Sequence, residues 1–234
     1  MIRFERVSFS YEKDEPVLAA VDLELGPGLT LFLGPNGSGK STLLKLAAGV
    51  EKPDSGLVTV DGHDIWKDEV EARSRLAYLP EQPDLTPYAT LREVLGLVCR
   101  LRGQPLDAGL SSLDFFGLLP FAHRSVRELS MGQRKRAVWA AVLVGSPGYF
   151  LLDEPLETLD RGIRDAVVGW IHSRVQEGAS VAVVSHAIEP FLLTADRAVA
   201  FHGRKPLFFA GLPVDPEEKL SFLEGLARDR VTRS

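Results

Sequence analysis

The segment Gly34–Ser41 combines glycines, a lysine and a serine at the spacing of a phosphate-binding loop,. Glycines let the backbone curl so that successive N–H groups point at a phosphate, and a helix that starts at the loop adds its positive N-terminal end. In such a loop the Lys40 ammonium reaches the outer phosphates of ATP and the Ser41 hydroxyl binds Mg²⁺. The alternative is a glycine-rich turn between a strand and a helix. We predict ATP binding, because strand, loop, Lys-Ser pair and helix occur in the order that the motif requires.

Two carboxylates, Asp153 and Glu154, follow the apolar segment Tyr149–Leu152. Asp153 suits the coordination shell of Mg²⁺, and Glu154 suits the base that orients or deprotonates an attacking water. Taken alone, the pair could equally be the solvated end of a strand. Together with the Gly34–Ser41 loop it predicts hydrolysis of the bound ATP.

His186 follows another apolar segment, Val181–Val184. A lone histidine is more often structural than functional. Its place just after a buried strand puts it at the carboxyl edge, where α/β sheets hold their ligands. We therefore predict that His186 belongs to the same site.

The segment Leu129–Gln133 has a hydroxyl and a glycine at the start of a predicted helix, and three basic residues follow it, Arg134, Lys135 and Arg136. The N–H groups and dipole of a helix start can hold a phosphate. The alternative is that Ser130 only caps its own helix.

The elements that must position these residues follow from the spacing of apolar side chains. Two alternating segments predict antiparallel strands, and later alternation of helices with buried strands predicts a parallel sheet covered on both faces. A segment from about Pro83 to Glu128 has helical patterns broken by glycine and proline and predicts a mostly helical insertion. The expected strands are Ile2–Phe9, Val17–Leu25, Leu29–Leu33, Val58–Val60, Leu76–Leu79, Tyr149–Leu152 and Val181–Val184, and the expected helices are Ser41–Ala48, Leu91–Leu101, Gln133–Leu143 and Arg161–Val175.

Composition narrows the class of protein. The chain has 234 residues, 45% of them hydrophobic and 25% charged, which is ordinary for a globular protein,. The formal net charge of -5 offers no basic field for nucleic acid,. Cys99 is the only cysteine, which excludes an intrachain disulfide and a zinc site built from cysteines,. Because the sequence has neither a signal peptide at its start nor an apolar run of about 18 residues, we expect a cytoplasmic protein.

The order of these motifs resembles that of the nucleotide-binding domains of ABC ATPases, over nearly the whole chain. The segments that carry the resemblance are the Gly34–Ser41 loop, Gln82, Leu129–Gln133, Asp153–Glu154, Leu159–Asp160 and His186. The resemblance implies an α/β fold with a P-loop NTPase (RecA-like) core, a mostly parallel sheet, an N-terminal antiparallel β subdomain and a helical insertion subdomain. It divides the single domain into a core of residues 1–82 and 129–211, a helical subdomain of residues 83–128, and a C-terminal helix and tail of residues 212–234.

The resemblance also implies roles for individual residues. Tyr11 would stack on adenine, Gln82 would touch Mg²⁺ or the attacking water, Asp160 would reach across a dimer interface, and His186 would hold the γ-phosphate near Glu154. A surface aromatic, a plain loop amide and a helix cap remain the alternatives for the first three. The implied catalytic residues are Glu154, His186 and Gln82; the implied nucleotide-binding residues are Tyr11, Gly34, Pro35, Asn36, Gly37, Ser38, Gly39, Lys40, Ser41, Thr42, Ser130, Gly132, Gln133 and Asp160; and the implied Mg²⁺ ligands are Ser41, Gln82 and Asp153.

Two positions depart from the family pattern. Met131 stands where glycine is usual, while Gly132, whose N–H is expected at the γ-phosphate, is retained. Glu157 replaces a smaller residue and is expected to tune the coupling between two sites or to do nothing.

The function implied by the resemblance is that of the ATPase subunit of an ABC transporter. Two such domains, identical or different, would clamp two Mg-ATP head to tail and drive a separate transmembrane permease that docks on residues 83–128. The protein would then lie at the inner face of the cell membrane, and the segments Leu79–Gln82 and Thr90–Glu93 resemble the exporter branch. The alternatives are an ABC ATPase that acts on nucleic acid or ribosomes, and a P-loop kinase. The kinase would leave the Ser130–Gln133 segment and His186 unexplained.

Overall fold

An antiparallel sheet is formed by the first part of the chain. The computed structural model describes residues 1–13, 15–82 and 85–228. The strands of this sheet pair in the order β2-β1-β4-β5 and comprise β1 (Ile2–Glu12), β2 (Glu15–Leu25), β4 (Ser55–Val60) and β5 (His63–Asp64). Side chains of β1 alternate between buried Ile2 and Phe4 and exposed Arg3 and Glu5, as expected of a sheet with one face in the core. At Arg6, where φ is +47°, a bulge adds one residue and shifts the register with β2,.

A second, six-stranded sheet has the order β10-β9-β3-β8-β7-β6. Strand β3 pairs in parallel with β8 and β9, β7 pairs in parallel with β8, and β10 is antiparallel to β9. Every residue of β8 is buried, which is typical of a parallel strand covered on both faces. The bounds are β3 (Gly28–Leu33), β6 (Leu76–Leu79), β7 (Tyr149–Asp153), β8 (Ser180–Val184), β9 (Ala195–Ala200) and β10 (Leu207–Phe209).

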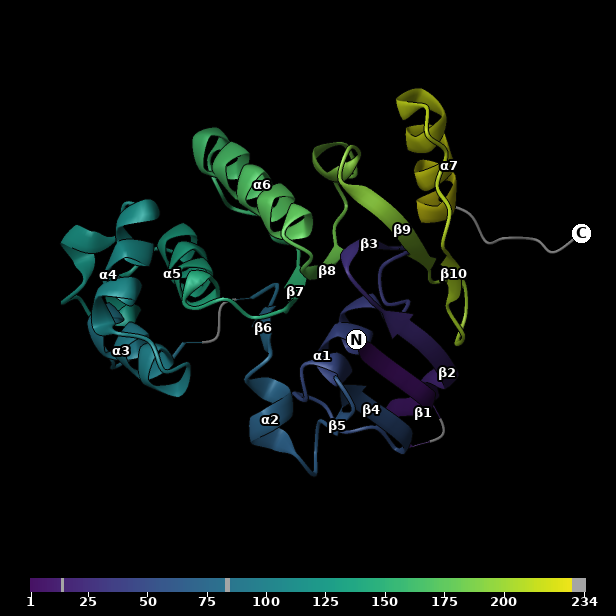
Figure 1. Cartoon of the computed structure of the whole chain (residues 1–234), viewed down its shortest axis with the longest axis horizontal. Coiled ribbons are helices and arrows are strands. Elements are labelled where there is room, and N and C mark those ends of the chain that lie inside the picture. The colour runs from purple at the N-terminus through teal and green to yellow at the C-terminus, as the bar shows by residue number, and fades with distance from the viewer. Residues whose placement is uncertain (14, 83–84, 229–234) are drawn as a thin grey trace, which may run out of the picture. The chain divides into compact units, whose positions relative to one another are not determined.

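Helices α1 (Lys40–Ala47), α2 (Glu69–Arg73), α6 (Arg161–Gln176) and α7 (Pro216–Arg228) follow strands of these sheets. Helix α1 buries leucines in a core shared by the two sheets, whose members include Phe4, Phe32, Leu43, Leu151 and Val184. Helix α7 lies beside β9 and buries Leu223 and Leu226 (Figure 1). Its Lys219 Nζ donates to the carbonyl oxygens of Leu192 and Ala195 at 3.3 and 3.1 Å.

Helices α3 (Leu91–Leu101), α4 (Leu106–Phe115) and α5 (Met131–Leu143) pack on one another, with short 3-10 helices η1 (Leu119–Phe121) and η2 (Val126–Glu128) between them; a third, η3 (Glu189–Phe191), follows β8. The α3–α4 contact is close: a Cβ on Gly109 would lie 2.9 Å from the sulfur of buried Cys99. Within the described ranges, no helix is both long and apolar enough to cross a membrane.

Two compact units divide the chain. One contains residues 1–78, 148–155 and the chain from Val168 onward, and the other contains residues 79–147 and 156–167. The second unit therefore holds α5 together with the helices of the predicted insertion. The predicted division at residues 83, 129 and 212 stays a prediction.

Most predicted elements are present, with differences at their ends. Helix α5 begins at Met131 instead of Gln133, because Ser130 caps it there. The expected antiparallel strands and α3 are in place. Strands β9 and β10 and helix α4 were not predicted, and the predicted tail falls largely at residues 229–234, outside the described residues. Asp196 and Arg197 interrupt the apolar pattern that would have marked β9.

Helix α3 offers a test of local stability. The Thr90 hydroxyl accepts a hydrogen bond from Glu93 N at 3.2 Å, and Thr90 N donates to the Glu93 carboxylate at 2.8 Å. Thr90→Ala removes this N-cap and should lower the free energy of unfolding by about 1 kcal/mol, measured by urea denaturation. Leu101→Ala, at an exposed position of the same helix, is the control, and an equal loss in both variants would contradict the role of the cap.

Candidate functional site

Three neighbouring parallel strands bring the predicted site residues of the first unit to one edge. In the register of the sheet, Phe32 of β3 lies opposite Val184 of β8, and Val184 lies opposite Asp153 of β7. Along the chain, the Gly34–Ser41 loop follows Phe32, His186 follows Val184, and Glu154 follows Asp153. The predicted loop, carboxylates and histidine thus meet at the carboxyl edge of the sheet.

The loop from Gly34 to Gly39 depends on glycine at both ends. Gly34 has φ of +143°, and a Cβ there would lie 2.6 Å from the backbone oxygen of Phe201. Gly39 has φ of +101°, with Val17 Cγ1 only 3.1 Å from an added Cβ. Other residues would therefore be strained in conformation and would collide with their neighbours. The loop ends where α1 begins, so the positive end of that helix faces the loop,.

Lys40 is buried within this loop. Its ammonium donates to the carbonyl oxygens of Gly34 and Pro35 at 2.8 and 2.9 Å. Burial lowers the pKa of Lys40 from its usual value, while the nearby carboxylates of Glu154 and Asp153 act in the opposite direction,. Phosphate oxygens near Lys40 would favour its charged form in the same way as these carboxylates do.

Ser41 and Asp153 place two hard oxygen atoms side by side. The Ser41 hydroxyl donates to Asp153 Oδ1 at 3.1 Å, and Asp153 is only 2% exposed. A hydroxyl and a carboxylate are oxygen ligands of the kind that Mg²⁺ prefers, and this ion is usually held by one or two protein groups together with phosphate oxygens and water. The pair therefore fits the predicted Mg²⁺ site.

Glu154 and His186 form a second pair. His186 Nε2 lies 3.6 Å from Glu154 Oε1, and His186 N donates to Glu154 Oε2 at 3.4 Å. The Glu154 side chain is largely buried and that of His186 largely exposed. Glu154 has φ of +45°, an uncommon conformation for a residue with a side chain, and its N–H donates to Val184 O at 2.9 Å,. Such strain is often found at functional sites.

Tyr11 lies next to the start of α1. Its hydroxyl is 3.3 Å from Thr42 Oγ1, the ammonium of Lys45 lies 5.9 Å from the centre of its ring, and the residue is 54% exposed. An exposed aromatic ring beside the loop is of the type that stacks on a flat ligand.

The remaining predicted residues belong to the other compact unit. Ser130 caps α5, since its hydroxyl accepts from Gln133 N at 3.2 Å and its own N–H donates to Gln133 Oε1 at 2.9 Å. Asp160 Oδ1 accepts from Ile163 N at 3.1 Å at the start of α6. The structural alternatives for Ser130 and Asp160 are therefore observed, and each leaves the side chain at an exposed helix start.

Gly132 and Met131 lie in the first turn of α5. A Cβ on Gly132 would be 3.3 Å from Thr158 O, so this turn packs closely on the segment before Asp160. Met131 is 58% exposed. Gln82 is exposed as well.

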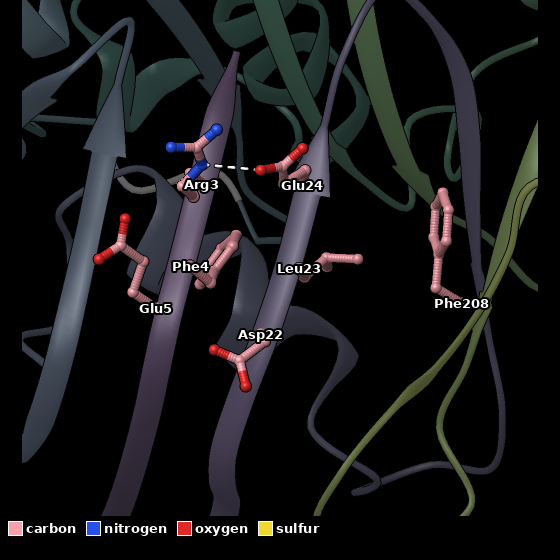
Figure 2. A pocket seen from close by; sticks show the side chains of 7 residues that line it. All are labelled: Arg3, Phe4, Glu5, Asp22, Leu23, Glu24 and Phe208. Atoms are coloured by element: carbon pink, nitrogen blue, oxygen red, sulfur yellow. Dashed lines mark hydrogen bonds and ion pairs between the residues drawn. The ribbon is translucent and has the colours of Figure 1, made fainter.

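A surface hollow of about 420 Å³ lies elsewhere, on the antiparallel sheet and β10 (Figure 2). An Arg3–Glu24 ion pair at 2.8 Å joins adjacent strands β1 and β2 in its lining, and both side chains are about half exposed, so the pair adds little stability,. None of the predicted site residues lines the hollow, whose lining comprises Arg3, Phe4, Glu5, Asp22, Leu23, Glu24 and Phe208.

The sequence matches the family described as ABC transporter over residues 18–157. A protein of Pyrococcus horikoshii whose name describes it as an ABC transporter ATP-binding protein is 32% identical over 221 residues, which is 89% of this chain and 83% of that protein. The Nod factor export ATP-binding protein I of Rhizobium etli is 31% identical, covering 88% of this chain and 66% of that protein. The sulfate/thiosulfate import ATP-binding protein CysA of Mycobacterium bovis is 32% identical, covering 81% of this chain and 55% of that protein.

Solved structures share the fold. An ATP-binding subunit of an ABC transporter has a TM-score of 0.82 at 22% identity, covering 96% of this chain and 95% of that one. A dimeric ATP-binding cassette in a post-hydrolysis state bound to ADP and Pi has a TM-score of 0.77 at 25% identity, covering 88% and 96%. The chain therefore belongs to the ABC transporter family, with the α/β fold of P-loop NTPases, and is an ATP-binding subunit that hydrolyses ATP.

Proposed function

We propose that this subunit works as one half of a head-to-tail dimer that closes around two Mg-ATP and drives a separate transmembrane permease. The observation that carries the proposal is the edge of the sheet where Lys40, Ser41–Asp153 and Glu154–His186 lie together. It combines a cation for phosphates, oxygens for Mg²⁺ and a carboxylate for water, which are the parts that ATP hydrolysis requires.

We assign each residue a separate task. The N–H groups of Gly34 and residues 36–42 bind the phosphates together with the Lys40 ammonium, whereas proline at position 35 has no N–H,. Tyr11 stacks on adenine, and Ser41 and Asp153 hold Mg²⁺ with Gln82. When bound, Mg²⁺ neutralises charge on the β- and γ-phosphates. Glu154 accepts a proton from the attacking water, and its contact with His186 keeps the carboxylate aimed while His186 holds the γ-phosphate.

The second half of each site comes from the partner subunit. The first turn of α5, with its N–H groups and the Ser130 hydroxyl, would supply this half, since a helix start favours an anion,. Asp160 would cross the same interface. A dimeric relative bound to ADP and Pi supports this arrangement. Met131 replaces glycine without affecting Gly132, so dimer closure should be preserved.

The permease would dock on residues 83–128. Supporting this, α3, α4 and η1 expose large apolar side chains, namely Leu97, Leu101, Phe115 and Leu119. The subunit would then lie on the inner face of the cell membrane. We favour export, on the exporter-like segments 79–82 and 90–93. Relatives named for export and for import have similar sequence identity to this chain, so the preference for export rests on those segments and not on identity.

Glu154→Gln tests the base. The amide keeps the shape of the side chain but cannot take up a proton, so turnover should fall at least about 100-fold while ATP still binds. An ATP-bound dimer should then accumulate, which size-exclusion chromatography with Mg-ATP would show. The control is Glu24→Gln, an exposed acid of the antiparallel sheet that pairs with Arg3. Turnover like that of the wild type in Glu154→Gln would refute the assignment of Glu154.

Dilution tests whether each site is shared between subunits. Because one subunit carries only half of each site, turnover per subunit should fall as the chain is diluted below the concentration at which it dimerises, while ATP binding persists. Turnover would be measured over a dilution series, with a fluorescent ATP analogue reporting binding. Constant turnover per subunit across the series would show that one chain carries a complete site.

Copurification tests the partner. The tagged chain, isolated from gently solubilised native membranes, should bring down a protein with several membrane spans in a fixed ratio. Leu101→Asp should lose this protein, because a charge would enter the apolar docking surface, whereas Val70→Asp, at another exposed apolar position, should keep it,. Recovery of ribosomes or DNA without a membrane protein would favour the non-transport alternative.

A further inference from the structure

The three basic residues that follow Leu129–Gln133 make hydrogen bonds to other segments of their unit. All three side chains lie on α5 and donate to backbone carbonyl oxygens, and each reaches a different segment. The bonds run from Arg134 Nη2 to Arg127 O at 3.2 Å, from Lys135 Nζ to Pro80 O at 2.9 Å and Glu81 O at 2.8 Å, and from Arg136 Nη1 to Phe116 O at 3.0 Å.

Lys135 differs from its neighbours in burial. The residue is only 1% exposed, and an ammonium is costly to remove from water unless hydrogen bonds compensate. Bonds from a charged donor are also shorter and stronger than those between neutral groups. The two hydrogen bonds therefore fix the position of the Lys135 side chain, and they also fix the backbone at Pro80 and Glu81.

The segment that Lys135 binds leads directly into Gln82. Strand β6 ends at Leu79, so Pro80 and Glu81 form the first backbone after the strand and join it to Gln82. Lys135 itself lies five residues after Ser130, in the second turn of α5. A single side chain thus joins the backbone before Gln82 to the helix whose start is assigned to the partner's phosphate.

We propose that Lys135 is a positioning residue for Gln82, which makes the Gln82 segment move as one body with the start of α5. The inference rests on the proposed function, because it takes the role of Gln82 from there. When the start of α5 shifts to meet a nucleotide, the backbone at Pro80 and Glu81 must shift with it. Gln82 would then reach Mg²⁺ and water only when α5 is in place, which couples hydrolysis to dimer closure.

A purely structural lysine would also satisfy the two carbonyls, so the test must separate stability from positioning. Lys135→Met keeps most of the side-chain volume and removes all donors. If Lys135 acts through Gln82, removing Gln82 first should leave little for Lys135→Met to change, because groups that act as a unit are not additive.

The experiment is a double-mutant cycle of Lys135→Met and Gln82→Ala in the full chain, with kcat and KM for ATP measured at a concentration where dimers form. Gln82→Ala and Lys135→Met should each lower kcat on the order of 10- to 100-fold, with KM within about twofold of the wild type. The double variant should match Gln82→Ala. Lys135→Gln, whose amide can still donate to one carbonyl, should give an intermediate kcat.

The matched control is Arg102→Met. Arg102 Nη1 donates to the carbonyl oxygens of Ala141 and Val142, each at 3.3 Å, and to that of Val144, at the opposite end of α5. Loss of Arg102 should lower stability in a similar way. Any effect of Arg102→Met on kcat should be the same factor in the wild type and in the Gln82→Ala background.

The outcomes separate the inference from the proposal beneath it. If Gln82→Ala is impaired and Lys135→Met lowers kcat by the same factor in both backgrounds, Lys135 is only structural and the inference fails alone. If Gln82→Ala turns over like the wild type, the role of Gln82 is wrong and the inference fails with it. If Lys135→Met does not fold, the cycle with Lys135→Gln decides between the same outcomes.

Discussion

The register of three parallel strands is the constraint on which the site depends. Phe32, Val184 and Asp153 lie in one row across β3, β8 and β7. Because side chains alternate along a strand, a slip by one residue would turn Asp153 to the opposite face. Strand β8 is buried along its whole length and lies between the other two, so the core itself opposes such a slip.

The carboxyl edge of this sheet contains charged groups whose burial is unfavourable for stability. Lys40 is buried, Asp153 and Glu154 are buried near it, and Glu154 has a strained backbone. Strain of this kind costs on the order of 1–3 kcal/mol, and buried charges add to it. The opposite charges of Lys40 and the two carboxylates partly offset one another. The two carboxylates outnumber the single ammonium, and this remaining imbalance of charge suits a ligand that brings phosphates and a metal ion together.

The fold was largely predictable where local signals agree with packing. For helix α3, apolar periodicity coincides with a capping box at Thr90 and Glu93, and its predicted bounds are those observed. Strand β9 was missed because exposed Asp196 and half-buried Arg197 interrupt its apolar pattern. Helix α4 was missed because it fits between Gly103 and Gly117, which were interpreted only as breaks.

The order of motifs predicts which residues form the site but not their contacts. The contact of Ser41 with Asp153 depends on the order and register of β3, β8 and β7, whereas the strand pattern predicted only a parallel sheet. The burial of Lys135 could not be foreseen, because a run of three basic residues usually indicates a solvated helix face. In the proposed function the start of α5 contacts a second copy of the chain or a related one, and a single sequence contains no geometry for that contact.

Cys99 gives the molecule a practical property. It is the only cysteine of the chain, and it lies buried in α3 against Gly109. A thiol so enclosed reacts slowly with alkylating reagents. A cysteine introduced at an exposed position, such as Leu193 or Tyr88, would then be the site of labelling in the otherwise native chain. A spectroscopic probe could therefore be attached without first removing a native residue from the core.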